Sequence, residues 1–425
     1  MSSSRVMSCA LATAVQRDAE MLALRLIETP RVRAARERTR ATLLQDPLAQ
    51  TPDGRLGLDR ALDQWLLALT MRVVNADASR PQVIWNVYNP PRVWLGHTYP
   101  GAAVAIDNPD NTNREIPIDG AGSYEIRGGF SIKPTQFTIE IVADFDGYAG
   151  LGRTLVALTI QTIVSEAGSF TITVSPEPAQ GRPNHLQSEL GLLWIFARDS
   201  MPDWSQTVTA LEVRRTDGRP QPPVRSEDEL VEDIVASMPV WVGFWSRFKD
   251  GLLGCPEPNC LVGPNGRPGG WGFLAGGRFR LSDDEALLIT TTDGEANYTG
   301  FQISDPWTIS PDPIHRLANL SKAQVKPNSD GSFTYIVASL DPGFHNWIDT
   351  VGLSEGWMLL RWQGLPPTTD PATLVRSVTQ VRSVTQVRFD DLARALPPDV
   401  PRICLEERAA QVALRIAHHA RRLKQ

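Results

Sequence analysis

The segment GSFTITV at residues 168–174 returns as GSFTYIV at residues 331–337, and this pair decides the fold. In each copy a glycine turn leads into β-branched and aromatic residues that alternate with smaller or polar ones. Such a period of two is typical of a strand in an antiparallel sheet. The repeat predicts two copies of one β unit, with Phe170 and Phe333 at equivalent positions.

Polar loops follow both segments. The first loop contains Asn184-His185, and the second contains His345-Asn346. Each loop then leads into a further apolar segment that carries an arginine, Arg198 in the first copy and Arg361 in the second. Differences of a few residues between the copies fit this interpretation, because surface loops tolerate insertions at small entropic cost.

Outward from these segments, the chain divides by composition. Short runs rich in Val, Ile, Phe and Thr, separated by Gly, Pro and Asp turns, indicate an antiparallel sandwich or barrel. We expect a mainly β fold with helical additions, in five parts: a helical segment (1–80), a first β unit (81–216), a linker with helices and a Gly/Pro-rich loop (217–280), a second β unit (281–400) and a C-terminal helix (401–425).

Helical periodicity marks the ends and the middle. Helices are expected over 11–45, with Pro30 as the one breaker, and over 58–74. Ser226 followed by Glu229 has the order of a capping box, which predicts a helix to about residue 238 and a second helical stretch over 240–253. Residues 261–277 are expected to form an open loop. Residues 405–424 form an amphipathic helix, in which we expect His418 and His419 to be solvated.

Two shorter segments need separate interpretation. The run at 151–163 fits either a helix or a buried strand. The hexapeptide VRSVTQ occurs twice in succession, at 375–380 and 381–386. Such perfect tandem identity indicates a short duplication, not a solenoid, and we expect a strand-like stretch without chemistry.

Composition limits the class of protein. The 425 residues carry a formal net charge of −6, with 42% hydrophobic and 21% charged residues. A negative balance argues against a nucleic-acid partner, which needs a basic face. No apolar run reaches the roughly 20 residues of a membrane span, and the weak apolar run near the start does not predict a signal peptide. We expect a cytoplasmic protein that binds a small molecule and forms a homo-oligomer. The N-terminal helices could either cap a β core or form the oligomer contact.

Cys255 and Cys260 lie in GCPEPNC, a spacing like half of a zinc knuckle. A structural zinc usually takes four ligands, and the next histidine along the chain is His315. We therefore expect no zinc here, but a Pro-rich turn with two free thiols. The alternative is a disulfide in an oxidising compartment.

The second polar loop is the strongest candidate for chemistry. It combines His345, Asn346, Trp347 and Asp349 within a few residues. Histidine titrates near neutrality and serves as general acid or base, and a carboxylate can orient it. We predict His345 as acid/base with Asp349 as its orienter. The competing interpretation is that both residues stabilise the turn.

The first loop supplies His185 as a further catalytic candidate and Asn184 as a binding candidate. Asn297 and Tyr298, which lead into a strand, are also predicted to bind substrate, and Arg361 or Arg198 is predicted to anchor an anion. Asx-rich turns such as DNPDN at 107–111 are most often solvated hairpins. They can instead give oxygen ligands to a divalent metal, although no cofactor is evident.

Several of these segments together resemble bacterial proteins that carry the domain of unknown function 1214, often beside the domain of unknown function 1254. The resemblance covers roughly residues 80–365. It rests on DNPDN with Arg114, SYEIRG (123–128), GRPNHLQ (181–187), Asp199 with Trp204, and above all DPGFHNWIDTVGLSEGWMLLRW (341–362). It implies two jelly-roll-like β-sandwich units with helical additions. The family pattern NPDN-x-Tyr-Arg has Asn113 at the tyrosine position here, which puts the role of the first unit in doubt. The family's name records no activity.

Two functions fit the sequence. The first is a non-redox acid–base enzyme, of the lyase, isomerase or hydrolase type, acting on a small, partly apolar molecule in a tryptophan-lined pocket. No nucleotide-binding or hydrolase motif points elsewhere. The alternative is a non-catalytic carbohydrate- or lipid-binding or assembly module. The two differ in whether polar groups of the pocket converge on one point.

Overall fold

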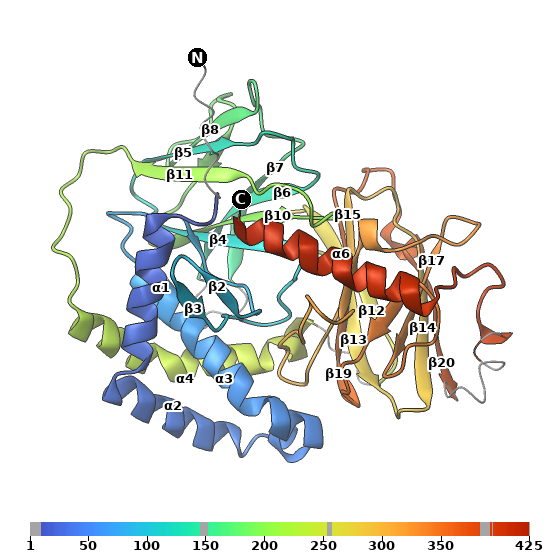
Figure 1. Cartoon of the computed structure of the whole chain (residues 1–425). Helices are drawn as coiled ribbons and strands as arrows, with labels where there is room; N and C mark the ends of the chain where they lie inside the picture. Colours follow the sequence, from blue (N-terminus) through green and yellow to red (C-terminus); the bar gives the residue numbers. More distant parts are fainter. Residues whose placement is uncertain (1–9, 145–151, 253–256, 383–391, 393, 425) are drawn as a thin grey trace.

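The fold consists of two β-sandwiches side by side, with helices packed against them. A computed structural model describes residues 10–144, 152–252, 257–382, 392 and 394–424. Figure 1 shows the first sandwich next to the second, helices α1 to α4 packed below, and helix α6 crossing the surface. The expected mainly β class with helical ends is confirmed.

The first sandwich pairs a five-stranded sheet, in the order β1-β4-β10-β6-β7, with a four-stranded sheet, β11-β5-β8-β9. Their inner faces enclose a core of Ile, Phe and Val side chains. The strands are β1 (Ile84–Trp85), β4 (Asn111–Asp119), β5 (Tyr124–Gly129), β6 (Phe137–Ala143), β7 (Arg153–Thr159), β8 (Ser169–Ser175), β9 (His185–Gln187), β10 (Leu192–Ser200) and β11 (Ala210–Arg215). A hairpin of β2 (Arg92–Trp94) and β3 (His97–Tyr99) lies apart.

The second sandwich repeats this arrangement, with the sheets β12-β13-β19-β15-β16 and β20-β14-β17-β18. Each position in the first sandwich therefore has a counterpart in the second. The strands are β12 (Val262–Gly266), β13 (Gly272–Arg280), β14 (Glu285–Thr291), β15 (Tyr298–Ser304), β16 (Asn319–Ser321), β17 (Phe333–Ala338), β18 (Trp347–Asp349), β19 (Glu355–Gln363) and β20 (Val375–Arg382).

The register confirms the predicted equivalence of Phe170 and Phe333. Strand β8 pairs in parallel with β9, with Thr173 opposite His185, and β17 pairs in parallel with β18, with Ile336 opposite Trp347. Thr173 and Ile336 each lie three residues after the phenylalanine of their copy, so the two phenylalanines are equivalent. The same register aligns Asn184 with Asn346, one residue before each pairing.

The helical layer has its own core, which also includes side chains of the second sandwich. The helices are α1 (Ala14–Ile27), α2 (Pro30–Leu43), α3 (Pro52–Val74) and α4 (Glu227–Leu252). Pro30 and Pro52 occupy the first turns of α2 and α3, where a missing N–H does no harm. Across the described part of the chain, each helix is too short or too polar to cross a membrane.

Several local expectations needed correction. The stretch expected to be an open loop contains β12 and most of β13. The two helical stretches expected around Pro239 form one helix, α4, with this proline inside. Cys260 is disulfide-bonded, so the expectation of a free thiol at this position is wrong. Cys255 lies outside the described residues. Within the ambiguous run at 151–163, residues 153–159 form strand β7. The first VRSVTQ copy lies in β20, whereas most of the second copy is outside the described residues.

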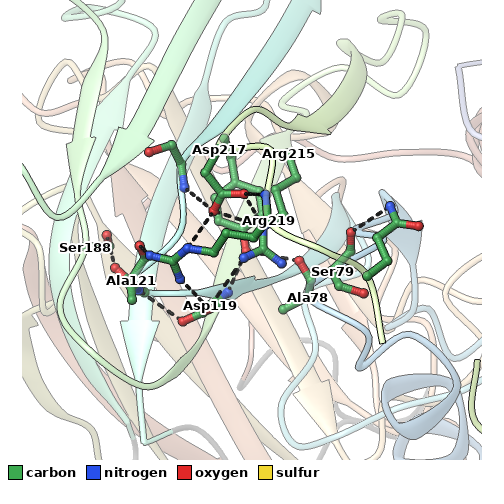
Figure 2. Close-up of polar contacts among 12 residues, drawn as sticks. Ala78, Ser79, Asp119, Ala121, Ser188, Arg215, Asp217 and Arg219 are labelled. Carbon is green, nitrogen blue, oxygen red and sulfur yellow. Dashed lines mark hydrogen bonds and ion pairs between the residues drawn. The ribbon is translucent and has the colours of Figure 1, made fainter. Parts of the chain in front are cut away.

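The linker that leaves the first sandwich is tied back to it at its start (Figure 2). The Arg219 guanidinium donates to the Ala121 carbonyl at 2.7 Å, and Arg215 Nε donates to Asp217 at 2.9 Å. The backbone N–H of Ser123 also donates to Asp217, at 3.3 Å. These contacts fix the direction in which the chain departs toward α4.

Helix α6 (Leu405–Lys424) docks mainly through arginines, with Val412 and Leu423 packed against buried apolar side chains. Arg408, Arg415 and Arg422, spaced seven residues apart, are 7%, 2% and 1% exposed. Arg408 binds Asp341 in the second sandwich, whereas Arg422 donates to the Pro109 carbonyl of the loop before β4. The helix therefore joins both sandwiches. His419 also lies on the inner face, where burial lowers its pKa to about 3, so the expectation that it is solvated is wrong.

Candidate functional site

A cavity of about 370 Å³ lies where the outer faces of the two five-stranded sheets meet, closed on one side by α4. Both sandwiches contribute to it. Its lining includes Asp107, Asn108, Asn111, Asn113 and Glu115 before and in β4; Glu140 and Val142 of β6; Phe196 and Arg198 of β10; Trp245 and Phe248 of α4; Asn265, Arg267 and Trp271 near β12; and Leu359 and Arg361 of β19.

Strand alternation explains why polar residues face this cavity. In β10, Ile195 and Ala197 point into the first sandwich core, so Phe196 and Arg198 point outward. Strand β19 does the same with Arg361, because its neighbours belong to the second core. Since β10 and β19 are the central strands of equivalent sheets, the duplication itself places an arginine from each unit at one site.

Arg198 is held by a carboxylate. Glu140 forms an ion pair with Arg198 through one oxygen. Its other oxygen accepts from Thr154 Oγ1 at 3.1 Å and from Trp271 Nε1 at 3.3 Å. The Arg198 guanidinium also lies 5.5 Å from the Trp271 ring centroid. The charge of Arg198 is thus balanced within the protein, and its position is fixed.

Two further arginines have no such balance. Arg361 donates to the Gln302 amide oxygen and to the Ile106 carbonyl, both neutral acceptors. The Arg267 guanidinium stacks 4.2 Å from the Trp271 ring centroid. Among the residues that the structure describes, neither guanidinium forms an ion pair. Burial, together with Arg198 and Arg361, lowers the pKa of Arg267 to about 9. The cavity therefore has an excess of positive charge.

Asp107 lies in the same cavity with an unusual protonation equilibrium. Burial raises its pKa to about 7, against the opposing effects of the Val104 N–H and of Arg361. The Val104 N–H donates to Asp107 Oδ2 at 2.7 Å. Glu115, nearby, is instead paired with Arg72 at 3.1 Å. Asp107 is thus the carboxyl group of this cavity that changes charge near neutral pH.

The predicted catalytic pair of the second loop has other contacts. His345 Nδ1 lies 3.1 Å from the Asn346 side-chain oxygen, and burial lowers the His345 pKa. Asp349 accepts from Arg316 and, at 2.8 Å, from the Val351 N–H. The structure therefore does not place Asp349 against His345, and neither residue lines the cavity.

The predicted site residues of the first loop also make structural contacts and do not line the cavity. His185 Nδ1 lies 2.8 Å from Thr173 Oγ1, and His185 Nε2 lies 2.8 Å from the Glu177 carbonyl. In β18, Trp347 donates to the Ala338 carbonyl at 2.9 Å. These side chains connect β8 and β17 with the loops beside them.

Asn184 and Asn346 perform the same task in the two units. Each amide forms two bonds with the backbone of a residue 20 positions earlier. Asn184 pairs with the N–H and carbonyl of Val164 at 2.8 and 2.7 Å. Asn346 pairs with those of Lys326 at 2.9 and 2.8 Å. The amide takes the place of a neighbouring strand, and this contact ties the loop to the sandwich.

Tyr298 belongs to a buried network beside the cavity. Its hydroxyl donates to Asp110 at 2.7 Å and accepts from the Asn108 amide at 2.7 Å. Asp110 also accepts from Trp204 Nε1 at 2.7 Å and from the Asn319 amide at 2.8 Å. The DNPDN loop thus crosses from the first unit to the second. Asn297 lies on the preceding turn, where its N–H donates to the Gly364 carbonyl.

The structure places both Arg198 and Arg361, either of which the sequence offered as an anion anchor, in one cavity, together with Asp107, Glu140 and Arg267. Glu140 could have been found from the sequence, because it is a charged residue at an outward position of a strand that is otherwise mostly apolar. Arg267 had none, because it lies in a stretch expected to be a loop. In the described ranges, no group of three or more His, Cys, Asp or Glu side chains is placed to hold a metal ion.

Comparisons with known proteins support the fold. No family model and no curated protein matches the chain. The crystal structure of an uncharacterized protein from Burkholderia cenocepacia matches with a TM-score of 0.70 and 22% identity, over 85% of this chain and 99% of that one. The VPA0106 protein from Vibrio parahaemolyticus matches with a TM-score of 0.40 and 10% identity, over 66% and 90%. The resemblance to proteins with the domain of unknown function 1214 stays a prediction.

Proposed function

We propose that the cavity between the sandwiches binds a small, partly apolar anion and that Asp107 exchanges a proton with it. The protein would then be a non-redox acid–base enzyme. One observation carries the proposal: a carboxyl group with a pKa near neutrality shares a cavity with two arginines that have no acidic partner among the described residues.

The charge of the cavity favours an anion. Glu140 balances Arg198, and Arg72 balances Glu115. Arg267 and Arg361 remain without an ion pair among the described residues. Asp107, which carries a partial charge near pH 7, and Asp110 act on Arg361 only through longer-range attraction. Buried guanidinium groups without counterions are unfavourable, so a bound carboxylate or phosphate would lower their free energy. Arginine also offers the paired donors that suit these anions.

The other residues that line the cavity favour a ligand whose uncharged part is apolar. Trp245 and Phe248 come from α4, and Val142, Phe196 and Leu359 come from the facing strands. A cavity of about 370 Å³ is at the small end of the range for ligand sites. A molecule such as an aromatic or short-chain carboxylate would place its charge near Trp271 and its body against α4.

Asp107 supplies the chemistry. A general acid or base works best when its pKa lies near the working pH, because both forms are then populated. The Val104 N–H fixes Oδ2, which leaves Oδ1 to exchange a proton with the ligand. Arg361, which opposes the raised pKa of Asp107, would stabilise negative charge that develops on the ligand.

Binding is tested with benzoate, benzyl alcohol and benzylamine, which share a ring and differ in charge. We expect benzoate to raise the melting temperature and the other two to leave it unchanged. The Arg267→Gln variant should lose this response, whereas the matched control Arg38→Gln, at an exposed position on α2, should keep it. An equal response to benzylamine would refute an anion site.

Catalysis is tested separately. Carboxylates that bind and carry an acidic C–H are incubated with the protein in deuterium oxide, and deuterium incorporation is followed by NMR. Wild type should catalyse exchange, and Asp107→Asn should bind without exchange. Binding with no exchange in wild type would instead favour the non-catalytic binding module.

A further inference from the structure

Helix α6 exposes apolar residues on the face that points away from the protein. Leu414 is 56% exposed, and Ala410, Ala413 and Ala417 on the same face are also exposed. Leu405 and Ile416, 80% and 37% exposed, lie at the opposite edge of this face, because an α-helix turns by about 100° per residue. The helix is strongly amphipathic, yet its inner face is the one that carries Arg408, Arg415, His419 and Arg422. An amphipathic helix of a monomer normally has the reverse orientation.

Arg408 and Arg415 on the inner face are each held there by several contacts, which fixes this orientation. Arg415 donates to the Pro313 carbonyl and, at 2.7 Å, to the Asn319 amide oxygen, and it stacks 4.3 Å from the Trp204 ring centroid. Arg408 pairs with Asp341 at 2.9 Å. Turning the helix over would break these contacts, so the apolar face stays outside.

Charges at the two ends of this face are complementary. Glu406 precedes the apolar residues and Arg421 follows them; both side chains are exposed. Consider a second copy of α6 packed antiparallel about a two-fold axis between Ala413 and Leu414. Residues whose numbers sum to 827 then face each other, which places Glu406 opposite Arg421, and Ala410 opposite Ala417, twice by symmetry.

We propose that two copies of this chain associate through the outer face of α6, antiparallel, with Glu406 of each chain against Arg421 of the other. A two-fold interface uses the same patch on both chains, and this patch is self-complementary in charge. Small residues at its centre let the two helices approach closely. Figure 1 shows α6 on the surface across both sandwiches, with no element drawn over it.

The size of the interface sets its expected strength. A 20-residue helix is about 30 Å long and about 10 Å wide, so its outer face provides roughly 300 Å² per chain. Stable interfaces bury at least about 1,200 Å² in total. We therefore expect a weak dimer, with a dissociation constant in the micromolar range.

Sedimentation velocity of the full chain over the micromolar range tests this. Wild type should convert from one to two chains as concentration rises. Leu414→Glu should stay monomeric, because it places two charges at the two-fold axis. Glu406→Arg and Arg421→Glu should each weaken association about tenfold, and the double variant should restore it. Glu166→Arg, an equal charge reversal on another exposed loop, is the matched control.

The restoration distinguishes an interface from a folding defect. Glu406 lies in the first turn of α6, where reversal of its charge also opposes the helix dipole. Melting temperatures therefore accompany each measurement: the double variant should keep any loss of stability and still regain association. A wild type that stays monomeric, a dimer that persists in Leu414→Glu, or a double variant without restored association would each overturn the proposal.

Discussion

Replacing Asp107 with Asn should make the protein more stable at high pH and remove the proton exchange that we propose for this residue. Burial raises the Asp107 pKa from 3.8 to about 7, so the native state holds this proton more tightly than the unfolded chain does. Between these two values the unfolded chain releases the proton first. Stability therefore falls as pH rises through this window, and the loss is complete above pH 7.

The magnitude follows from the two pKa values. Each pKa unit corresponds to about 1.4 kcal/mol, so ionised Asp107 lowers the free energy of unfolding by up to about 4 kcal/mol at pH 8. Water in the cavity reduces this figure, and we expect about 2 to 4 kcal/mol. The introduced amide oxygen can still accept the Val104 N–H, so the variant loses the charge and retains that bond.

Urea unfolding of wild type and Asp107→Asn at pH 4, 5, 6, 7 and 8 measures the difference. The variant should match wild type at pH 4 and exceed it progressively up to pH 8. Because all other groups titrate in both proteins, their effects cancel. A difference that does not change with pH, or a variant less stable at pH 8, would refute the raised pKa and with it the assigned role.

Three further changes test the surroundings of the site. Asn346→Ala should lower the free energy of unfolding by about 2 kcal/mol, because it removes both bonds to the Lys326 backbone; a loss below about 0.5 kcal/mol in urea unfolding would contradict this. His345→Ala should cost about 1 kcal/mol and leave the benzoate response intact; loss of that response with normal melting would instead assign the ring to the site. Arg198→Met should lower the free energy of unfolding by about 3 kcal/mol, because Glu140 is left buried without its cation. Adding Glu140→Gln to this variant should recover most of the lost stability in thermal melts.

Much of the architecture could be predicted because it depends on local patterns. Period-two alternation marked β8 and β17, and the repeated GSFT turn aligned them to the residue. Strands β12 and β13 were missed for a physical reason. Gly263, Gly266, Gly272, Gly276 and Gly277 resemble loop sequence. At Gly272, however, a Cβ would meet the backbone of β19 at 2.6 Å, and at Gly277 it would meet the backbone of Cys260, just before β12, at 1.9 Å. Close packing of strands, and not flexibility, explains these two glycines.

The site was harder to predict because its residues meet only after the two units pack together. Arg198 and Arg361 could each be singled out from the sequence, since each follows the same motif in its copy, but the sequence did not show that they share a cavity. Asp107 was part of a turn that is most often solvated, and its raised pKa comes from burial by the other unit. The histidines drew attention by residue type, yet their rings bond within their own loops. A residue's chemistry is visible in the sequence, whereas its surroundings are not.

The contacts of the α6 arginines also imply an order in which parts of the fold form during synthesis. Helix α6 follows both sandwiches in the chain, so it leaves the ribosome after them. Each sandwich can form its own core earlier, as domains do during synthesis. Arg415 and Arg422 complete the junction around the DNPDN loop, so the cavity between the sandwiches would close last. A nascent chain of this protein would therefore hold two folded halves and an open junction between them until α6 docks.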